Sequence, residues 1–205
     1  MEETKTITEK RVKGDLRQEI LDAARELFVR EGYENVSMRK IAQKIEYSPT
    51  TIYLYFQDKA DLLDSLCEEA FGKLFDRLKA MYEEGGDPEA SLRLGIRAYI
   101  EFGIENPQHY AVTFMRMPPV DIESVLHSRR HELGMKAFDS LRKAIQACVD
   151  AGQFRPLDVE STSQVLWAAM HGLTSLLVSC SYFPWVEKDR LIDTLVAVQT
   201  DALRK

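Results

Sequence analysis

The chain has 205 residues, of which 45% are hydrophobic and 29% are charged. These values are close to those of soluble globular proteins, so they exclude a disordered chain and a fibrous one. The net charge of −6 does not suggest a nucleic-acid binder, but residues 1–60 hold eleven basic and eleven acidic side chains and are neutral. Contact with DNA would therefore need a local patch and not a basic protein.

The first residues and the cysteines bear on location and on metal sites. Residues 1–14 are polar and of mixed charge, unlike a secretory signal, so we expect a cytoplasmic protein. Cys67, Cys148 and Cys180 are widely spaced and form no CxxC pair, which argues against a disulfide framework and a structural zinc site. We expect no metal and no cofactor. Polar residues, glycine and proline interrupt the charge-free interval 161–186, so a buried helix is favoured there and no membrane partner is expected.

The spacing of apolar residues predicts an all-α fold. Apolar residues recur at helical spacing almost throughout, and no stretch alternates as a strand does. Glycine and proline signals divide the chain into about nine helices, with the strongest turn at 85–88. We predict a flexible arm at 1–15, an N-terminal domain at 16–62 and a C-terminal domain at 63–205, joined by a helix that begins near Asp58.

The first predicted helix, at 16–31, supports the N-terminal domain, and Gly32 ends it. Its apolar face consists of Ile20, Ala23, Ala24, Leu27 and Phe28. Basic residues of the preceding arm can contact phosphates or the minor groove, although a solvated tail is the simpler expectation. They are Lys5, Lys10, Arg11 and Lys13.

Two short helices follow, at about residues 37–56. Ser37 is the expected N-cap of the first, and Ser48-Pro49 begins the second after a tight turn. Two capped short helices at this spacing are typical of a helix-turn-helix. The basic side chains that point outward from the first of them are Arg39, Lys40 and Lys44. These cations are placed to meet phosphates.

The second of these helices presents a surface without carboxylates, while Ile52 and Phe56 turn to the core. Its outward residues are Thr50, Thr51, Tyr53, Leu54 and Tyr55. Hydroxyl groups and a threonine methyl can touch base edges in the major groove, while tyrosines and Lys59 bond phosphates. From composition alone, an ordinary three-helix subdomain with exposed tyrosines explains the pattern equally well.

The run from Arg17 to Leu63 resembles the DNA-binding domain of the tetracycline-repressor (TetR) family. The matching segments are Ile20–Ala24, Leu27-Phe28, Gly32-Tyr33, Ser37–Ala42, Ser48–Phe56 and Lys59–Leu63. The resemblance implies a homodimer that binds a double-stranded DNA operator. It also implies a small-molecule effector pocket in the C-terminal domain, and release of the operator when the effector binds.

By the same resemblance, the DNA-binding residues fall into three groups. Phosphate contacts are implied for Ser37 and Arg39. The base-reading face is implied to consist of Thr50, Thr51 and Leu54, beside the cap residue Ser48. Contacts that clamp the DNA backbone are implied for Tyr53, Tyr55 and Lys59. Leu54 offers no hydrogen bond. Base readout is therefore expected to rest on the threonines and on van der Waals contact with thymine methyl groups.

In the family the last two helices build the dimer, and 159–182 shows two apolar stripes on a helical wheel. The first is Leu166, Met170, Leu173, Leu177 and Cys180; the second is Trp167, His171, Thr174, Val178 and Tyr182. One stripe is expected to pack on a partner and the other on the core. The last helix, 186–203, carries Leu191, Leu195, Val198 and Ala202 at near-heptad spacing, as a four-helix interface requires.

Residues 167–172 resemble a Trp-x-x-x-His-Gly pattern seen in some C-terminal domains of the family. His171 is either a satisfied core histidine or a ligand contact that can carry a proton signal. The expected ligand-binding residues are Tyr99, Phe102, Phe114, Met115, Phe138, Trp167, Met170 and His171, with Met117 nearby. Such side chains can equally well fill a core; the resemblance favours a cavity.

Three functions compete. The first is a ligand-released repressor, and the second is a DNA-binding protein of the same fold that a protein partner controls. The third is an enzyme that uses His171 and Cys180, but nine residues on one helix place these side chains on opposite faces. No nucleophile elbow, phosphate-binding glycine loop or paired-histidine metal motif is present, so we expect no catalytic residues.

Overall fold

The computed structural model describes residues 2–82, 86–115, 123, 126 and 128–205. Within these residues it has nine α-helices and no strand, which confirms the predicted all-α fold. The helices are α1 (Glu2–Glu31), α2 (Met38–Lys44), α3 (Pro49–Tyr53), α4 (Lys59–Tyr82), α5 (Pro88–Glu105), α6 (Pro107–Tyr110), α8 (Arg129–Asp150), α9 (Val159–Ser179) and α10 (Lys188–Asp201). A π-helical turn, η2 (Ala111–Met115), follows α6.

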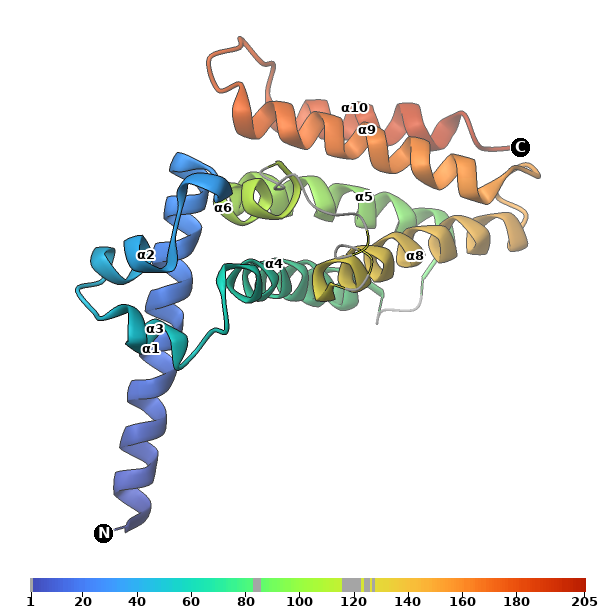
Figure 1. Ribbon diagram of the computed structural model, residues 1–205. Coiled ribbons are helices and arrows are strands. Elements are labelled where there is room, and N and C mark those ends of the chain that lie inside the picture. Colours follow the sequence, from blue (N-terminus) through green and yellow to red (C-terminus); the bar gives the residue numbers. More distant parts are fainter. Residues whose placement is uncertain (1, 83–85, 116–122, 124–125, 127) are drawn as a thin grey trace.

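Two groups of helices share α4. At one end α2 and α3 pack on α1, and α4 leads away from this unit (Figure 1). There α4 forms a four-helix bundle with α5, α8 and α9, which α10 covers on the α5 and α9 side. The buried side chains of both groups belong to one continuous core, from Ile20 and Ile52 through Leu66 to Ile96 and Leu166. Helix α4 therefore contributes side chains to the core of both groups.

Helix α1 is longer than predicted. It begins at Glu2 and not near residue 16, so residues 2–15 of the expected arm at 1–15 are helical. The reason lies in the sequence, which has no proline in this stretch and a single glycine, Gly14. One glycine weakens a helix by only about 1 kcal/mol and does not end it.

The predicted caps form. Ser37 Oγ accepts a hydrogen bond from the Lys40 amide at 3.2 Å, and Ser48 Oγ accepts one from the Thr51 amide at 3.2 Å. Between α2 and α3, Glu46 adopts a left-handed backbone conformation with φ of 60°. This residue closes the tight turn, which fixes the angle between the two short helices.

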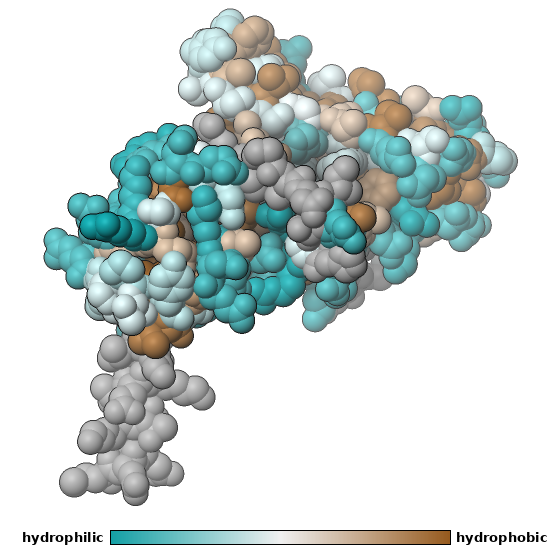
Figure 2. All heavy atoms as spheres, viewed as in Figure 1, coloured by the Kyte–Doolittle hydropathy of each residue, from teal (hydrophilic) through white to brown (hydrophobic). Residues whose placement is uncertain are grey.

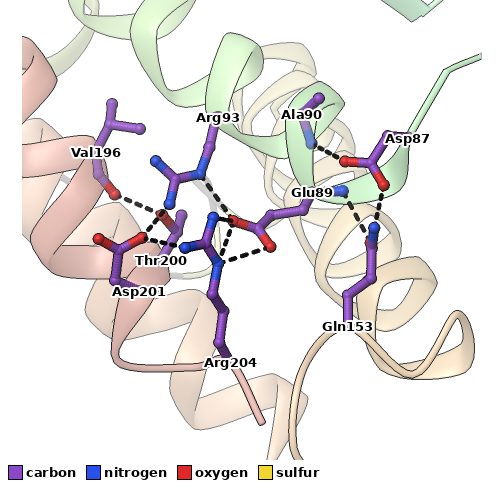
Figure 3. A network of polar contacts seen from close by, with 9 residues as sticks. All are labelled: Asp87, Glu89, Ala90, Arg93, Gln153, Val196, Thr200, Asp201 and Arg204. Atoms are coloured by element: carbon purple, nitrogen blue, oxygen red, sulfur yellow. Dashed lines mark hydrogen bonds and ion pairs between the residues drawn. The ribbon is translucent and has the colours of Figure 1, made fainter.

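A polar network fastens the start of α5 to the C-terminal segment (Figure 3). The Glu89 carboxylate is 11% exposed and accepts hydrogen bonds from Arg204, at 2.6 to 3.0 Å, and from Arg93 Nε at 2.9 Å. Arg93 also pairs with Asp201 at the end of α10. Gln153, after α8, accepts from the Glu89 amide at 3.1 Å. The network therefore ties α5, α8 and α10 together at the end of the bundle far from α2 and α3.

Replacing Glu89 by glutamine is expected to lower the free energy of unfolding at pH 7 by about 1 to 3 kcal/mol, since charge-assisted hydrogen bonds are lost. Hydrogen bonds from Arg204, with those from Arg93, hold the pKa of Glu89 below its ordinary value. The stabilisation is therefore complete above the ordinary glutamate pKa and is lost as pH falls through the lower folded-state value. Urea unfolding at pH 7 and pH 3.5 should show the two proteins converging in acid. An equal difference at both pH values would contradict this.

Candidate DNA-binding surface and ligand cavity

Helix α3 and the residues that follow it present their polar and apolar groups as predicted. Ile52 and Phe56 are buried, whereas Leu54 is 78% and Tyr53 54% exposed. Thr50 is exposed, and Thr51 and Tyr55 are half-buried. The hydroxyl groups of Thr51 and Ser48 lie 2.9 Å apart and form a hydrogen bond. The outward face thus combines hydroxyl, phenol and aliphatic groups.

The basic side chains beside this face differ in whether an acidic side chain of the protein pairs with them. Arg39 is exposed and has no ion pair among the described residues. Lys40 pairs with Glu31, and Lys44 Nζ lies 2.9 Å from Glu26 Oε1. Arg39 is therefore available to a phosphate as it stands, whereas the two lysines would have to exchange partners.

Lys59 holds α4 on the N-terminal domain. Its Nζ donates a hydrogen bond to the Tyr33 carbonyl at 2.8 Å and lies 4.1 Å from the centre of the Tyr33 ring. The sequence predicted a phosphate contact for this lysine. The structure gives it two partners within the protein.

The bundle of α4, α5, α8 and α9 encloses a cavity of about 730 Å³. Six of the eight predicted ligand-binding residues line it: Tyr99, Phe114, Phe138, Trp167, Met170 and His171. Phe102 does not, because it is 2% exposed and packs in the core three residues along α5 from Tyr99. Met115 is 37% exposed at the end of η2 and is also absent from the lining. Met117 lies outside the described residues.

Much of the wall comes from residues that sequence reasoning did not select. Helix α4 contributes Cys67, Phe71, Leu74 and Leu78; α5 contributes Leu92 and Ile96; α8 contributes Arg130, His131, Met135 and Leu141. The apolar period of α4 indicated a buried face. It could not show that this face borders an opening instead of another side chain.

His171 lies in a cluster of tyrosines on the cavity wall. Its Nδ1 is 2.6 Å from the Tyr110 hydroxyl and 3.3 Å from the Tyr99 hydroxyl. Burial lowers the pKa of His171 and raises the pKa of both tyrosines, so a neutral imidazole meets protonated phenols. His171 therefore has features of both interpretations of the sequence. It is hydrogen-bonded as a core histidine would be, and it borders the cavity as a ligand contact would.

The outward face of α9 differs from both predicted stripes. Leu166, Met170 and Thr174 share the inward face, although Thr174 was placed on the opposite stripe from the other two. The exposed face instead carries Val165, 60% exposed, and Leu176, 47% exposed. Trp167 and His171, from the second predicted stripe, border the cavity, so residues of both stripes point into the bundle.

On α10, Ile192 and Val196 face the core. The predicted stripe stays outside: Leu191 and Leu195 are half-buried, Ala202 is exposed and Val198 is 63% exposed. Hydrophobic side chains reach the surface over α9, α10 and the loop between them (Figure 2). Within the part of the chain that the structure describes, an apolar face on the last two helices is thus left uncovered.

A helix-turn-helix joined to a helical domain with an apolar cavity defines a class of ligand-responsive transcriptional regulators. The model of tetR-family bacterial regulatory proteins matches residues 20–66, and that of a tetracyclin repressor-like C-terminal domain matches residues 92–203. The chain belongs to the TetR family of transcriptional regulators. The resemblance of residues 17–63 to this family is confirmed, and the relatives are regulators and not enzymes.

Relatives of similar length extend the comparison. The chain is 25% identical, over 90% of both chains, to the "Fatty acid metabolism regulator protein" of Bacillus subtilis. The structure of the fatty acid degradation regulator FadR from Bacillus halodurans is similar, with a TM-score of 0.78, 22% identity and coverage of 92% and 96%. The structure of FadR from B. subtilis in complex with stearoyl-CoA is also similar, with a TM-score of 0.78 and 22% identity. The match covers 91% of this chain and 99% of that one.

In the part of the chain that the structure describes, no helix combines the length and the apolar character that a bilayer span requires. The charge-free stretch forms α9, whose inward face packs in the bundle.

Proposed function

We propose that this protein is a homodimeric cytoplasmic repressor, which binds a palindromic operator through α2 and α3 and releases it when a largely apolar ligand enters the cavity. The observation that carries the proposal is the continuous core, in which α4 lines the cavity and also packs on α1 of the helix-turn-helix unit. The DNA contacts are those proposed from the sequence: Ser37, Arg39, Ser48, Thr50, Thr51, Tyr53, Leu54, Tyr55 and, after it leaves Tyr33, Lys59.

The ligand is proposed to carry a long acyl chain. Phe71, Leu74, Ile96 and Leu141 give the cavity an apolar wall, and its volume is within the range of pockets for small molecules. The structure of FadR from B. subtilis was determined in complex with stearoyl-CoA. The B. subtilis relative found by sequence is a fatty acid metabolism regulator protein. An apolar cavity of this size favours a small molecule over control by a protein partner alone.

The dimer is proposed to form through the apolar face of α9 and α10. Val165, Leu176 and Val198 lie on it, and none has a partner within the described chain that buries it. Two-fold symmetry gives two reading helices, so two weak half-site contacts act together on one palindrome.

Release is proposed to proceed through α4. A ligand that separates α4 from α8 and α9 would move the start of α4, which follows α3 after five residues. The distance between the two reading helices of the dimer then no longer fits the operator. The coupling free energy in such systems is commonly about 1 to 3 kcal/mol.

Selection of bound sequences from random DNA, at about 150 mM salt, tests the function. One palindrome should emerge, bound by two chains in sedimentation experiments, with an affinity that falls steeply as salt rises. Acyl ligands should then displace the protein from that site. Recovery of no motif by a folded dimer would rule out an operator-specific repressor.

A further inference from the structure

Two polar side chains of the apolar cavity are poorly satisfied within the described residues. The Arg130 side chain is 9% exposed, and its Nε has no hydrogen-bond partner there. Thr113 is 5% exposed, and its Oγ1 atom makes no hydrogen bond of normal geometry with those residues, its neighbour being the Cys67 thiol. Both residues belong to the cavity wall. A buried donor without a partner is unfavourable, so such atoms in a ligand cavity point to a group of the ligand.

The one carboxylate near Arg130, among the described residues, does not satisfy it. Asp64 Oδ1 lies 3.8 Å from Arg130 Nε, which is too long for a hydrogen bond. Asp64 is itself 18% exposed, and burial raises the pKa of its carboxyl group. A guanidinium group has five N–H donors in a planar fork that fits a carboxylate or a phosphate. Arg130 therefore retains donors for a second oxyanion.

We infer that Arg130 binds an oxyanion of the effector, with the Thr113 hydroxyl as a second donor, while the apolar chain lies between α5, α8 and α9. The inference rests on the proposed function and narrows its ligand to apolar chains that end in a carboxylate or carry a phosphate. Neutral lipids of the same length would leave the guanidinium group unpaired.

The position of Arg130 also links this anion to the N-terminal domain. Arg130 is the second residue of α8, and Asp64 is in the second turn of α4. Arg129, which precedes Arg130 in α8, pairs with Asp61 at 3.0 Å and with Glu68 at 3.2 Å. The start of α8 is thus held on α4 by charge. An oxyanion that draws Arg130 away from Asp64 weakens this hold where α4 meets the helix-turn-helix.

Binding of dodecanoate and of dodecan-1-ol, followed by tryptophan fluorescence, to which Trp167 in the cavity wall contributes beside Trp185, tests the assignment without DNA. The wild type should bind dodecanoate at least about tenfold more tightly than the alcohol, as expected for one charge-assisted contact. Arg130→Met should abolish this preference. The matched control is Arg129→Met, because Arg129 is 51% exposed and outside the cavity wall; it should keep the preference.

Dodecanoyl-CoA distinguishes the two sources of the oxyanion. If Arg130→Met weakens the binding of dodecanoate, the group bound by Arg130 is a carboxylate. If it weakens only the binding of dodecanoyl-CoA, that group is a phosphate. Thr113→Val leaves the charge of Arg130 in place and should weaken the binding of the same anion several-fold. This variant tests the inference even if Arg130→Met folds poorly. Unchanged anion binding in both variants would overturn the inference. A wild type that prefers the anion but stays on DNA would contradict the proposed function and not the role of Arg130.

Discussion

Replacement of Leu54 by aspartate is expected to weaken operator binding strongly and to leave the fold intact. Leu54 is 78% exposed and contributes nothing to the core, yet it lies on the face proposed to enter the major groove. The substitution removes an apolar contact with bases and places a carboxylate beside phosphates. With about 1 to 3 kcal/mol lost at each of two half-sites, the affinity should fall roughly 30-fold to 10⁴-fold. Fluorescence anisotropy of labelled operator at about 150 mM salt measures it.

A matched substitution separates this effect from a change in net charge. Leu94 on α5 is 46% exposed and far from α3 in the sequence, so Leu94→Asp should leave operator affinity within about twofold. Both variants should unfold at the same urea concentration as the wild type. If Leu54→Asp binds as tightly as Leu94→Asp, α3 does not present the reading surface.

The N-terminal domain could be predicted closely because its signals are local. Ser37 and Ser48 are caps whose partners are three residues away, and Pro49 can only begin a helix. The inward position of Ile52 follows from helical spacing alone. The extent of α1 was missed because a polar segment with one glycine gives no signal for either state.

The cavity could be predicted only in part, since filling a core and lining an opening require the same side chains. Phe102 and Phe114 look alike in sequence, but one packs in the core and the other faces the cavity. Arg130 lies in a run of charged residues that reads as a solvated surface. Its burial depends on where α4 and α8 cross, which no local pattern records.

Gly103 is expected to tolerate no side chain, because α5 passes α9 and α6 closely at this residue. A Cβ atom there would overlap with Thr174 Cγ2 and would lie 2.8 Å from Tyr110 Cδ2, both well inside van der Waals contact. Thr174 and Tyr110 are fully buried and have no room to retreat. Gly103→Ala should therefore lower the free energy of unfolding by about 1 to 3 kcal/mol, despite the better helix propensity of alanine. Urea unfolding followed by circular dichroism measures the loss.

Gly72 provides the matched control, because a Cβ atom at this position of α4 meets no atom within 4 Å. Gly72→Ala should leave the protein unchanged or stabilise it by up to about 1 kcal/mol. The two substitutions are chemically identical, so their difference isolates the contact between the helices. Because Tyr110 also holds His171 in the cavity wall, Gly103→Ala should weaken binding of dodecanoate as well, whereas Gly72→Ala should not. Equal stability of the two variants would show that α5 and α9 can separate without loss, and a ligand could then enter without moving α4.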